Sequence, residues 1–119
     1  MKTILLLEDD RNLNTMITRR LEKEGYCVLS VFTIAEAKEH AKREEIAMVI
    51  SDVMLPDGNG MEFATQLREE RKTLLIYLTA MDQEMDIING YDGGADDYIT
   101  KPFSLLILIS KVNAFMRRY

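Results

Sequence analysis

The segment "MVISDVMLPDGNG", residues 48–60, places a carboxylate directly after an apolar run. Residues 48–51 are typical of a buried strand, and Asp52 separates them from the turn-forming cluster "PDGNG". The dipeptides Asp57-Gly58 and Asn59-Gly60 would also suit a β-hairpin. Because helix-periodic residues follow them, we interpret the segment as a strand-to-helix loop. Asp52 is therefore expected at a strand end, where other strand ends can bring partners to it.

Short apolar segments alternate with longer amphipathic ones along the whole chain. The predicted strands span residues 3–7, 27–31, 47–51, 74–78 and 97–100. The predicted helices span residues 11–24, 33–44, 60–71, 83–92 and 104–117. The first, third and fourth strands are apolar nearly throughout, as expected when both sheet faces are covered. The pattern predicts an α/β three-layer sandwich with a doubly wound, five-stranded parallel sheet.

Two local patterns support the helix assignments. The apolar face of helix 11–24 is predicted to consist of Leu13, Met16, Ile17 and Leu21. Thr33, followed by Glu36, is typical of a capping box that begins the second helix. Asp10 is the acid best placed to cap the first.

Composition excludes several classes of protein. The 119 residues are 47% hydrophobic and 29% charged, which is typical of one globular domain. No apolar run approaches the roughly 20 residues that cross a bilayer, so no membrane partner is expected. The net charge of -5 argues against direct nucleic-acid binding by this domain. The single Cys27 cannot form an internal disulfide, which favours a cytoplasmic location.

Acids, a hydroxyl and an amine follow four different predicted strands. In chain order they are Glu8, Asp9 and Asp10, then Asp52, then Thr79, then Lys101. Ligands of such sheets bind outside the carboxyl ends of the strands, so these groups should meet at one edge. Crowded carboxylates need a neutralising cation, and a site with room for water suits Mg²⁺. One carboxylate could then act as a nucleophile that carries a phosphoryl group.

The motifs "ILLLEDD", "VISDVMLPDGNG", "YLTA" and "GADDYITKPF" resemble the receiver (CheY-like) domain of two-component response regulators, over the whole chain, 1–119. The resemblance implies that a sensor histidine kinase supplies phosphate to the chain, which is then a phosphoacceptor and not a turnover enzyme. It also implies the strand order 2-1-3-4-5 and a cis Lys101-Pro102 bond.

The resemblance assigns roles residue by residue. Asp52 matches the phosphoacceptor, and Lys101 and Thr79 match the amine and hydroxyl that contact the phosphoryl group. Glu8, Asp9, Asp52 and the Met54 backbone carbonyl match the ligands of Mg²⁺ (or Mn²⁺). Tyr98 matches the aromatic switch residue that follows Thr79. Thr79 could instead cap a helix, and Tyr98 could be static core.

"GADDYITKPF" and the closing "MRRY" most resemble receivers of the OmpR/PhoB type, which precede a winged-helix DNA-binding domain. Such receivers form homodimers through the segments matching helix 83–92, strand 97–100 and helix 104–117. The two positions of one interface ion pair of that family hold Ile87 and Ile107 in this sequence. Asp97 and Lys111 retain the charges of a second pair. An apolar contact could replace the lost pair, or both isoleucines could turn inward. Any contact with DNA would need an effector domain absent from this chain.

Met54 and Met81 occupy the two positions that tune phosphate lifetime in that family. Neither side chain can orient an attacking water, so we expect a comparatively long-lived phosphoryl state.

Three other functions fit the same architecture. A flavin-binding electron carrier would need a phosphate-cradling loop where Glu8, Asp9 and Asp10 stand. An aspartyl phosphatase would need two aspartates around one apolar residue after the first strand. A receiver-like partner-binding domain without phosphate is disfavoured because Asp52 and Lys101 are both present.

Overall fold

The structure is a computed structural model of the chain, and it describes residues 1–80 and 95–118. The elements in chain order are β1 (Thr3–Leu7), α1 (Arg11–Lys23), β2 (Cys27–Val31), α2 (Ile34–Arg43), β3 (Met48–Asp52), β4 (Met54–Leu55), β5 (Gly58–Asn59), α3 (Gly60–Glu70), β6 (Leu74–Thr79), β7 (Asp97–Thr100) and α5 (Leu105–Arg118). The predicted helix 83–92 lies outside the described residues. No helix in the described part of the chain has both the length and the apolar character that a membrane crossing requires.

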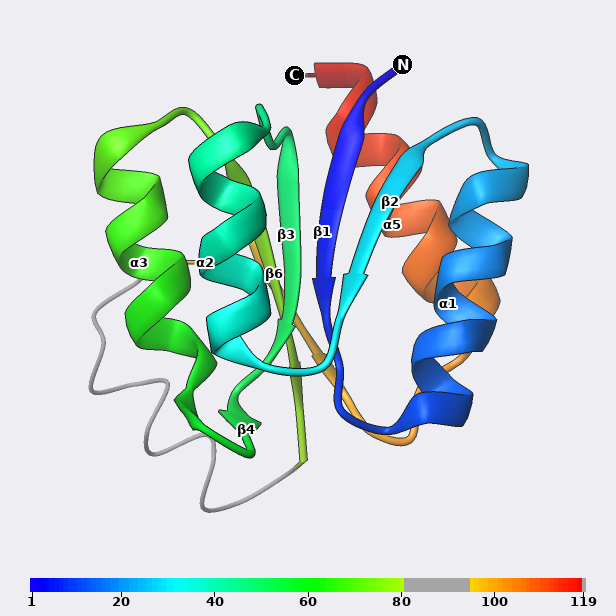
Figure 1. Cartoon of the computed structure of the whole chain (residues 1–119). Coiled ribbons are helices and arrows are strands. Elements are labelled where there is room, and N and C mark those ends of the chain that lie inside the picture. Colours follow the sequence, from blue (N-terminus) through cyan, green and yellow to red (C-terminus); the bar gives the residue numbers. More distant parts are fainter. Residues whose placement is uncertain (81–94, 119) are drawn as a thin grey trace.

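Five parallel strands form the central sheet in the order β2-β1-β3-β6-β7. This confirms the predicted α/β fold and strand order, since β6 and β7 are the fourth and fifth strands of the prediction. Helices α2 and α3 cover one face of the sheet, and α1 and α5 cover the other (Figure 1). The strands all point toward one edge, which is the lower edge in Figure 1.

Alternate side chains of the central strands enter two separate cores. Leu5 and Leu7 of β1 pack in the core beneath α2 and α3. Ile4 and Leu6 pack with α1 and α5 on the opposite face. Because both faces are buried, β1 needs apolar residues from Ile4 to Leu7, which accounts for the unbroken apolar sequence after Thr3.

The apolar face of α1 differs from the prediction at two positions. Met16 is 53% exposed, so its assignment to the buried face was wrong. Asn14 is buried instead, together with Ile17 and Leu21. Helical spacing alone is compatible with either Asn14 or Met16 on the buried face. Hydrogen bonds from Asn14 to other elements select Asn14.

A short hairpin lies within the segment that follows Asp52. Strands β4 and β5 pair antiparallel, with Met54 opposite Asn59 and Leu55 opposite Gly58. Our interpretation of a loop without a hairpin was therefore wrong, although a helix does follow from Gly60 onward, as expected. Gly58 has φ +144°, a conformation that residues with a side chain rarely adopt.

Asp57, at the tip of this hairpin, caps α2 from a distance. Its Oδ1 accepts a hydrogen bond from the Ile34 N–H at 2.9 Å, and its Oδ2 accepts one from the Ala35 N–H at 3.0 Å. Thr33 accepts a third from the Glu36 N–H at 3.2 Å, which confirms its predicted capping role. Three of the four free N–H groups at the start of α2 are thus satisfied.

Asp57→Ala is expected to lower the free energy of unfolding by roughly 0.5 kcal/mol at pH 7, a small cost because the carboxylate is exposed. The hydrogen bond from Ile34 is the main reason that the pKa of Asp57 is lowered. The stabilisation is therefore present above the unfolded-state pKa and disappears as the pH falls through the lowered folded-state pKa. Urea unfolding at pH 7 and pH 3 measures this. If the wild type and Asp57→Ala still differed in free energy of unfolding at pH 3, the capping role of the Asp57 carboxylate would be contradicted.

Candidate functional site

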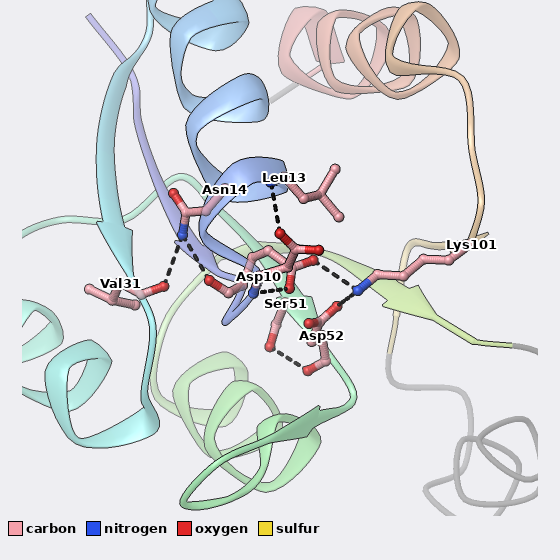
Figure 2. Close-up of polar contacts among 8 residues, drawn as sticks. Asp10, Leu13, Asn14, Val31, Ser51, Asp52 and Lys101 are labelled. Carbon is pink, nitrogen blue, oxygen red and sulfur yellow. Dashed lines mark hydrogen bonds and ion pairs between the residues drawn. The ribbon is translucent and has the colours of Figure 1, made fainter.

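The carboxyl ends of β1 and β3 and the segment after β7 bring three acids and one amine together. Carboxylate oxygens of Glu8, Asp9 and Asp52 all lie within 4.8 Å of one another. The Lys101 Nζ lies 2.9 Å from Glu8 Oε1 and 2.8 Å from Asp52 Oδ1. Figure 2 shows the Lys101 side chain reaching toward Asp52 from the far side of the site. The structure thus assembles four groups that the sequence places at three separate strand ends.

Burial differs sharply within the cluster. Glu8 is fully buried and Asp52 is 5% exposed, whereas Asp9 is exposed. A ligand can therefore approach from the Asp9 side, while Glu8 and Asp52 form the floor of the site. The three carboxylates supply the oxygen ligands that Mg²⁺ prefers, so the residues present fit a divalent cation.

Burial of Asp52 has a direct electrostatic consequence. Burial raises the pKa of Asp52 to about 9, and the neighbouring Glu8 adds to the rise while Lys101 opposes it. Burial alone would raise the pKa of Glu8. Hydrogen bonds with Asp52 and with the Lys101 ammonium outweigh this effect, so the pKa of Glu8 is lowered overall. Burial would lower the pKa of Lys101, yet the two carboxylates raise it overall. Without a metal, Glu8 and Asp52 therefore share one proton near neutral pH.

In the metal-free protein, the free energy of unfolding should fall as the pH rises from about 4 to about 9. The folded protein keeps a proton on Asp52 in this range and the unfolded chain does not, so each rise in pH favours unfolding. Asp52→Asn removes this dependence and should stabilise the protein at pH 8 by on the order of 1–3 kcal/mol. Chemical unfolding in EDTA at pH 5 and pH 8 measures it. A variant less stable than the wild type at pH 8 would refute the proton assignment.

Local hydrogen bonds hold the acid-bearing turn after β1. The Asp10 N–H donates to Glu8 Oε2 at 3.0 Å, and Asp10 Oδ1 accepts from the Leu13 N–H at 3.1 Å. Asp10 therefore caps α1, as predicted, and its carboxylate is not part of the acid cluster around Asp52. Asn14, which the sequence analysis did not single out, donates to the Glu8 carbonyl at 2.9 Å.

Gly60 supports the other side of the site. A Cβ at this position would lie 2.3 Å from the Asp52 carbonyl oxygen and 2.6 Å from Ser51 Oγ. The Gly60 N–H also donates to the Val53 carbonyl at 2.8 Å. Only glycine permits this approach of α3 to the end of β3. In the sequence, Gly60 has the pattern of a turn and a helix start, which gives no signal for this contact.

The remaining site residues lie along β6 and β7. Thr79 is fully buried at the end of β6, and its hydroxyl donates to the Ala80 carbonyl at 2.7 Å. The Lys101 N–H donates to the Thr79 carbonyl at 2.7 Å, which joins the two strand ends, and the Lys101-Pro102 bond is cis, as the resemblance implied. Tyr98 is half-buried and stacks on Tyr77 with ring centroids 6.0 Å apart.

Three of the residues predicted for an interface, Asp97, Ile107 and Lys111, lie on β7 and α5. Ile107 is 54% exposed and Leu106 is 63% exposed, so the alternative in which Ile107 turns inward was wrong. Lys111 Nζ pairs with Asp97 Oδ2 at 2.6 Å within the chain. Ile87 and Met81 lie outside the described residues.

Known proteins match this chain over nearly its full length. The family model of the response regulator receiver domain matches residues 4–113. The regulatory protein VanR of Enterococcus faecium is 40% identical over 116 residues, which cover 98% of this chain and 50% of VanR. The transcriptional regulatory protein SrrA of Staphylococcus aureus is 36% identical over 115 residues, which cover 97% of this chain and 48% of SrrA. The chain thus spans about half the length of these relatives.

Solved structures give the same result. The OmpR/PhoB homologue DrrB of Thermotoga maritima has a TM-score of 0.87 and 34% identity, with 99% of this chain and 54% of DrrB covered. The receiver domain of a Francisella response regulator has a TM-score of 0.85 and 30% identity, with 99% and 98% covered. Fold, acid cluster and similarity agree: the chain belongs to the response regulator receiver domain family, whose members are phosphoacceptors of two-component systems.

Proposed function

We propose that Asp52 accepts a phosphoryl group from a sensor histidine kinase in the bacterial cytoplasm. The main support is the meeting of Glu8, Asp9, Asp52 and Lys101 at one edge of the sheet. An Asp52 carboxylate oxygen attacks the phosphorus of the donor phosphohistidine. The bond between nitrogen and phosphorus breaks, the imidazole leaves and gains a proton, and an acyl phosphate forms on Asp52.

Glu8, Asp9, Asp52 and the Met54 backbone carbonyl would hold Mg²⁺ (or Mn²⁺), which would neutralise charge on the phosphoryl oxygens. Lys101 now lies between two carboxylates, and it can donate to a phosphoryl oxygen once Asp52 carries the new group. The Thr79 hydroxyl would turn from the Ala80 carbonyl toward the same group. Tyr98 would then change its packing on Tyr77, which shifts the population of the surface around β7 and α5.

The test is binding of beryllofluoride, which mimics a phosphoryl group on a carboxylate. Fluorine NMR should show bound beryllofluoride in the wild type only when Mg²⁺ is present, and none in Asp52→Ala. Signal in the variant, or none in the wild type with Mg²⁺, would contradict the proposal.

We infer that the chain is a receiver of the OmpR/PhoB type, followed by a DNA-binding effector domain in the full protein. Its similarity to VanR, SrrA and DrrB supports this, as does its coverage of about half of each. The output would be transcriptional, and contact with DNA would come only through that effector domain.

We infer that a homodimer forms through β7, α5 and the segment containing Ile87. Exposed Ile107 would supply apolar contact area, and Asp97 and Lys111 could exchange their present pairing for one across the interface.

Ile107→Glu is expected to weaken self-association of the unphosphorylated protein by about tenfold, because it places a charge in an apolar contact. Sedimentation equilibrium measures the change. The exposed Met16→Glu on α1 is the control, and an unchanged dimer in Ile107→Glu would refute the contact.

A further inference from the structure

Asn14 places a polar side chain in the core beneath α1. It is 1% exposed and lies with Ile17 and Leu21 on the buried face of the helix. Burial of an amide without partners would cost roughly 1–3 kcal/mol, so its hydrogen bonds decide whether the position is favourable.

Every hydrogen-bonding group of the Asn14 amide has a partner. Its Nδ2 donates to the Glu8 carbonyl at 2.9 Å and to the Val31 carbonyl at 3.2 Å. Its Oδ1 accepts from the Thr18 hydroxyl at 3.1 Å and from the Ser30 hydroxyl. Since carbonyls lie on one side and hydroxyls on the other, only one orientation of the amide satisfies all four groups.

The donor side of this amide holds the end of β1. The Val31 carbonyl also accepts a hydrogen bond from the Glu8 N–H at 3.2 Å, so Asn14 and Glu8 share one acceptor on β2. The Asn14 donors therefore link the Glu8 carbonyl and the Val31 carbonyl of β2 to the first turn of α1. Figure 2 shows the Asn14 amide directed toward Val31. From the linked peptide the Glu8 side chain extends to Lys101, and Asp9 follows it along the chain.

We propose that Asn14 is a positioning residue for the acid pair Glu8 and Asp9. It touches neither the cation nor the phosphoryl group of the proposed function, on which this inference rests. It acts through the Glu8 carbonyl, which it holds so that both carboxylates reach the edge of the sheet beside Asp52. Replacing a residue that hydrogen-bonds to a metal-binding residue commonly lowers metal affinity by about tenfold or more.

The experiment measures Mg²⁺ binding by calorimetry at pH 7 in two Asn14 variants and one control. Asn14→Asp keeps the shape and the acceptor but removes the donors, and Asn14→Leu removes the whole amide. Thr18→Val removes one hydroxyl from the acceptor side and leaves the bonds to Glu8 and Val31 intact. We expect the Asn14 variants to bind Mg²⁺ about tenfold more weakly, and the control to remain within about twofold of the wild type.

The outcomes separate a positioning role from a merely structural one. A structural role would lower the unfolding temperature without changing the dissociation constant for Mg²⁺ in the folded variant, and that result overturns the proposal. With a positioning role, saturating Mg²⁺ restores beryllofluoride binding by Asn14→Asp. A wild type that binds no Mg²⁺ would contradict the proposed function itself, whereas equal binding by wild type and variants contradicts only the role of Asn14.

A measurement on the wild type covers the case in which the Asn14 variants do not fold. Titration with Mg²⁺ should shift the Asn14 side-chain amide protons in NMR spectra along the same curve as the Asp10 amide, and these protons should exchange slowly. Rapid exchange, or no shift while Asp10 responds, overturns the proposal.

Discussion

Asp52→Ala is expected to abolish phosphorylation of the chain by a small phosphodonor such as acetyl phosphate. Asp52 is the buried carboxylate that contacts both Lys101 and the acid pair, and no other acid of the described residues has this environment. Glu8 contacts Lys101 as well, but it is fully buried. Intact-mass spectrometry in the presence of Mg²⁺ measures the incorporated phosphoryl group.

Asp57→Ala is the matched control for this variant. Asp57 lies five residues further along the same segment, is exposed, and binds the backbone of α2 rather than the acid cluster. It should therefore be phosphorylated like the wild type. Equal phosphate incorporation in Asp52→Ala and the wild type would place the acceptor elsewhere.

Gly60→Ala is expected to have the largest effect on stability, lowering the free energy of unfolding by roughly 3 kcal/mol. The added Cβ would lie 2.3 Å from the Asp52 carbonyl oxygen, which belongs to the backbone of a central strand and cannot move alone. For a domain of this size such a loss corresponds to a fall of roughly 10 °C in unfolding temperature. Because β3 must shift, we also expect weaker Mg²⁺ binding. Calorimetric unfolding with and without Mg²⁺ tests both effects.

Gly25→Ala separates steric conflict from backbone strain. Gly25 has φ +98°, yet nothing lies within 4 Å of a Cβ built there. Its replacement should cost only about 1 kcal/mol of left-handed strain. A Gly60→Ala protein as stable as Gly25→Ala would show that the close approach at Gly60 is not rigid.

The layers of the fold could be predicted because they depend on local patterns, whereas the order of the strands followed from the family resemblance. Continuous apolar runs such as 3–7 report burial on both faces, and parallel strands then bring their carboxyl ends to one edge. Asp52 and Lys101 could thus be expected to meet although 48 residues lie between them. The Thr33 cap was predictable for the same reason, since its signal lies within four residues.

Features that depend on tertiary hydrogen bonds or on very short strands could not be predicted from local patterns. Helical spacing alone did not decide between Met16 and Asn14, because hydroxyls and carbonyls of other elements select the buried side chain. The only signal for Asn14 was a polar residue three positions before Ile17 on an apolar face. The dipeptides Asp57-Gly58 and Asn59-Gly60 did signal the hairpin of β4 and β5, but the helix-periodic residues after them argued against it, and strands of two residues are too short for an alternating pattern.

We propose above that Asp52 is the nucleophile of a cation-dependent phosphoacceptor site. The most direct test of this proposal is to incubate the wild type with acetyl phosphate and Mg²⁺, reduce the product with borohydride, and locate the modified residue by peptide mass spectrometry. We expect homoserine at position 52, formed by reduction of the acyl phosphate, and none when EDTA replaces Mg²⁺. Modification at another carboxylate, or at Asp52 regardless of the cation, would contradict it.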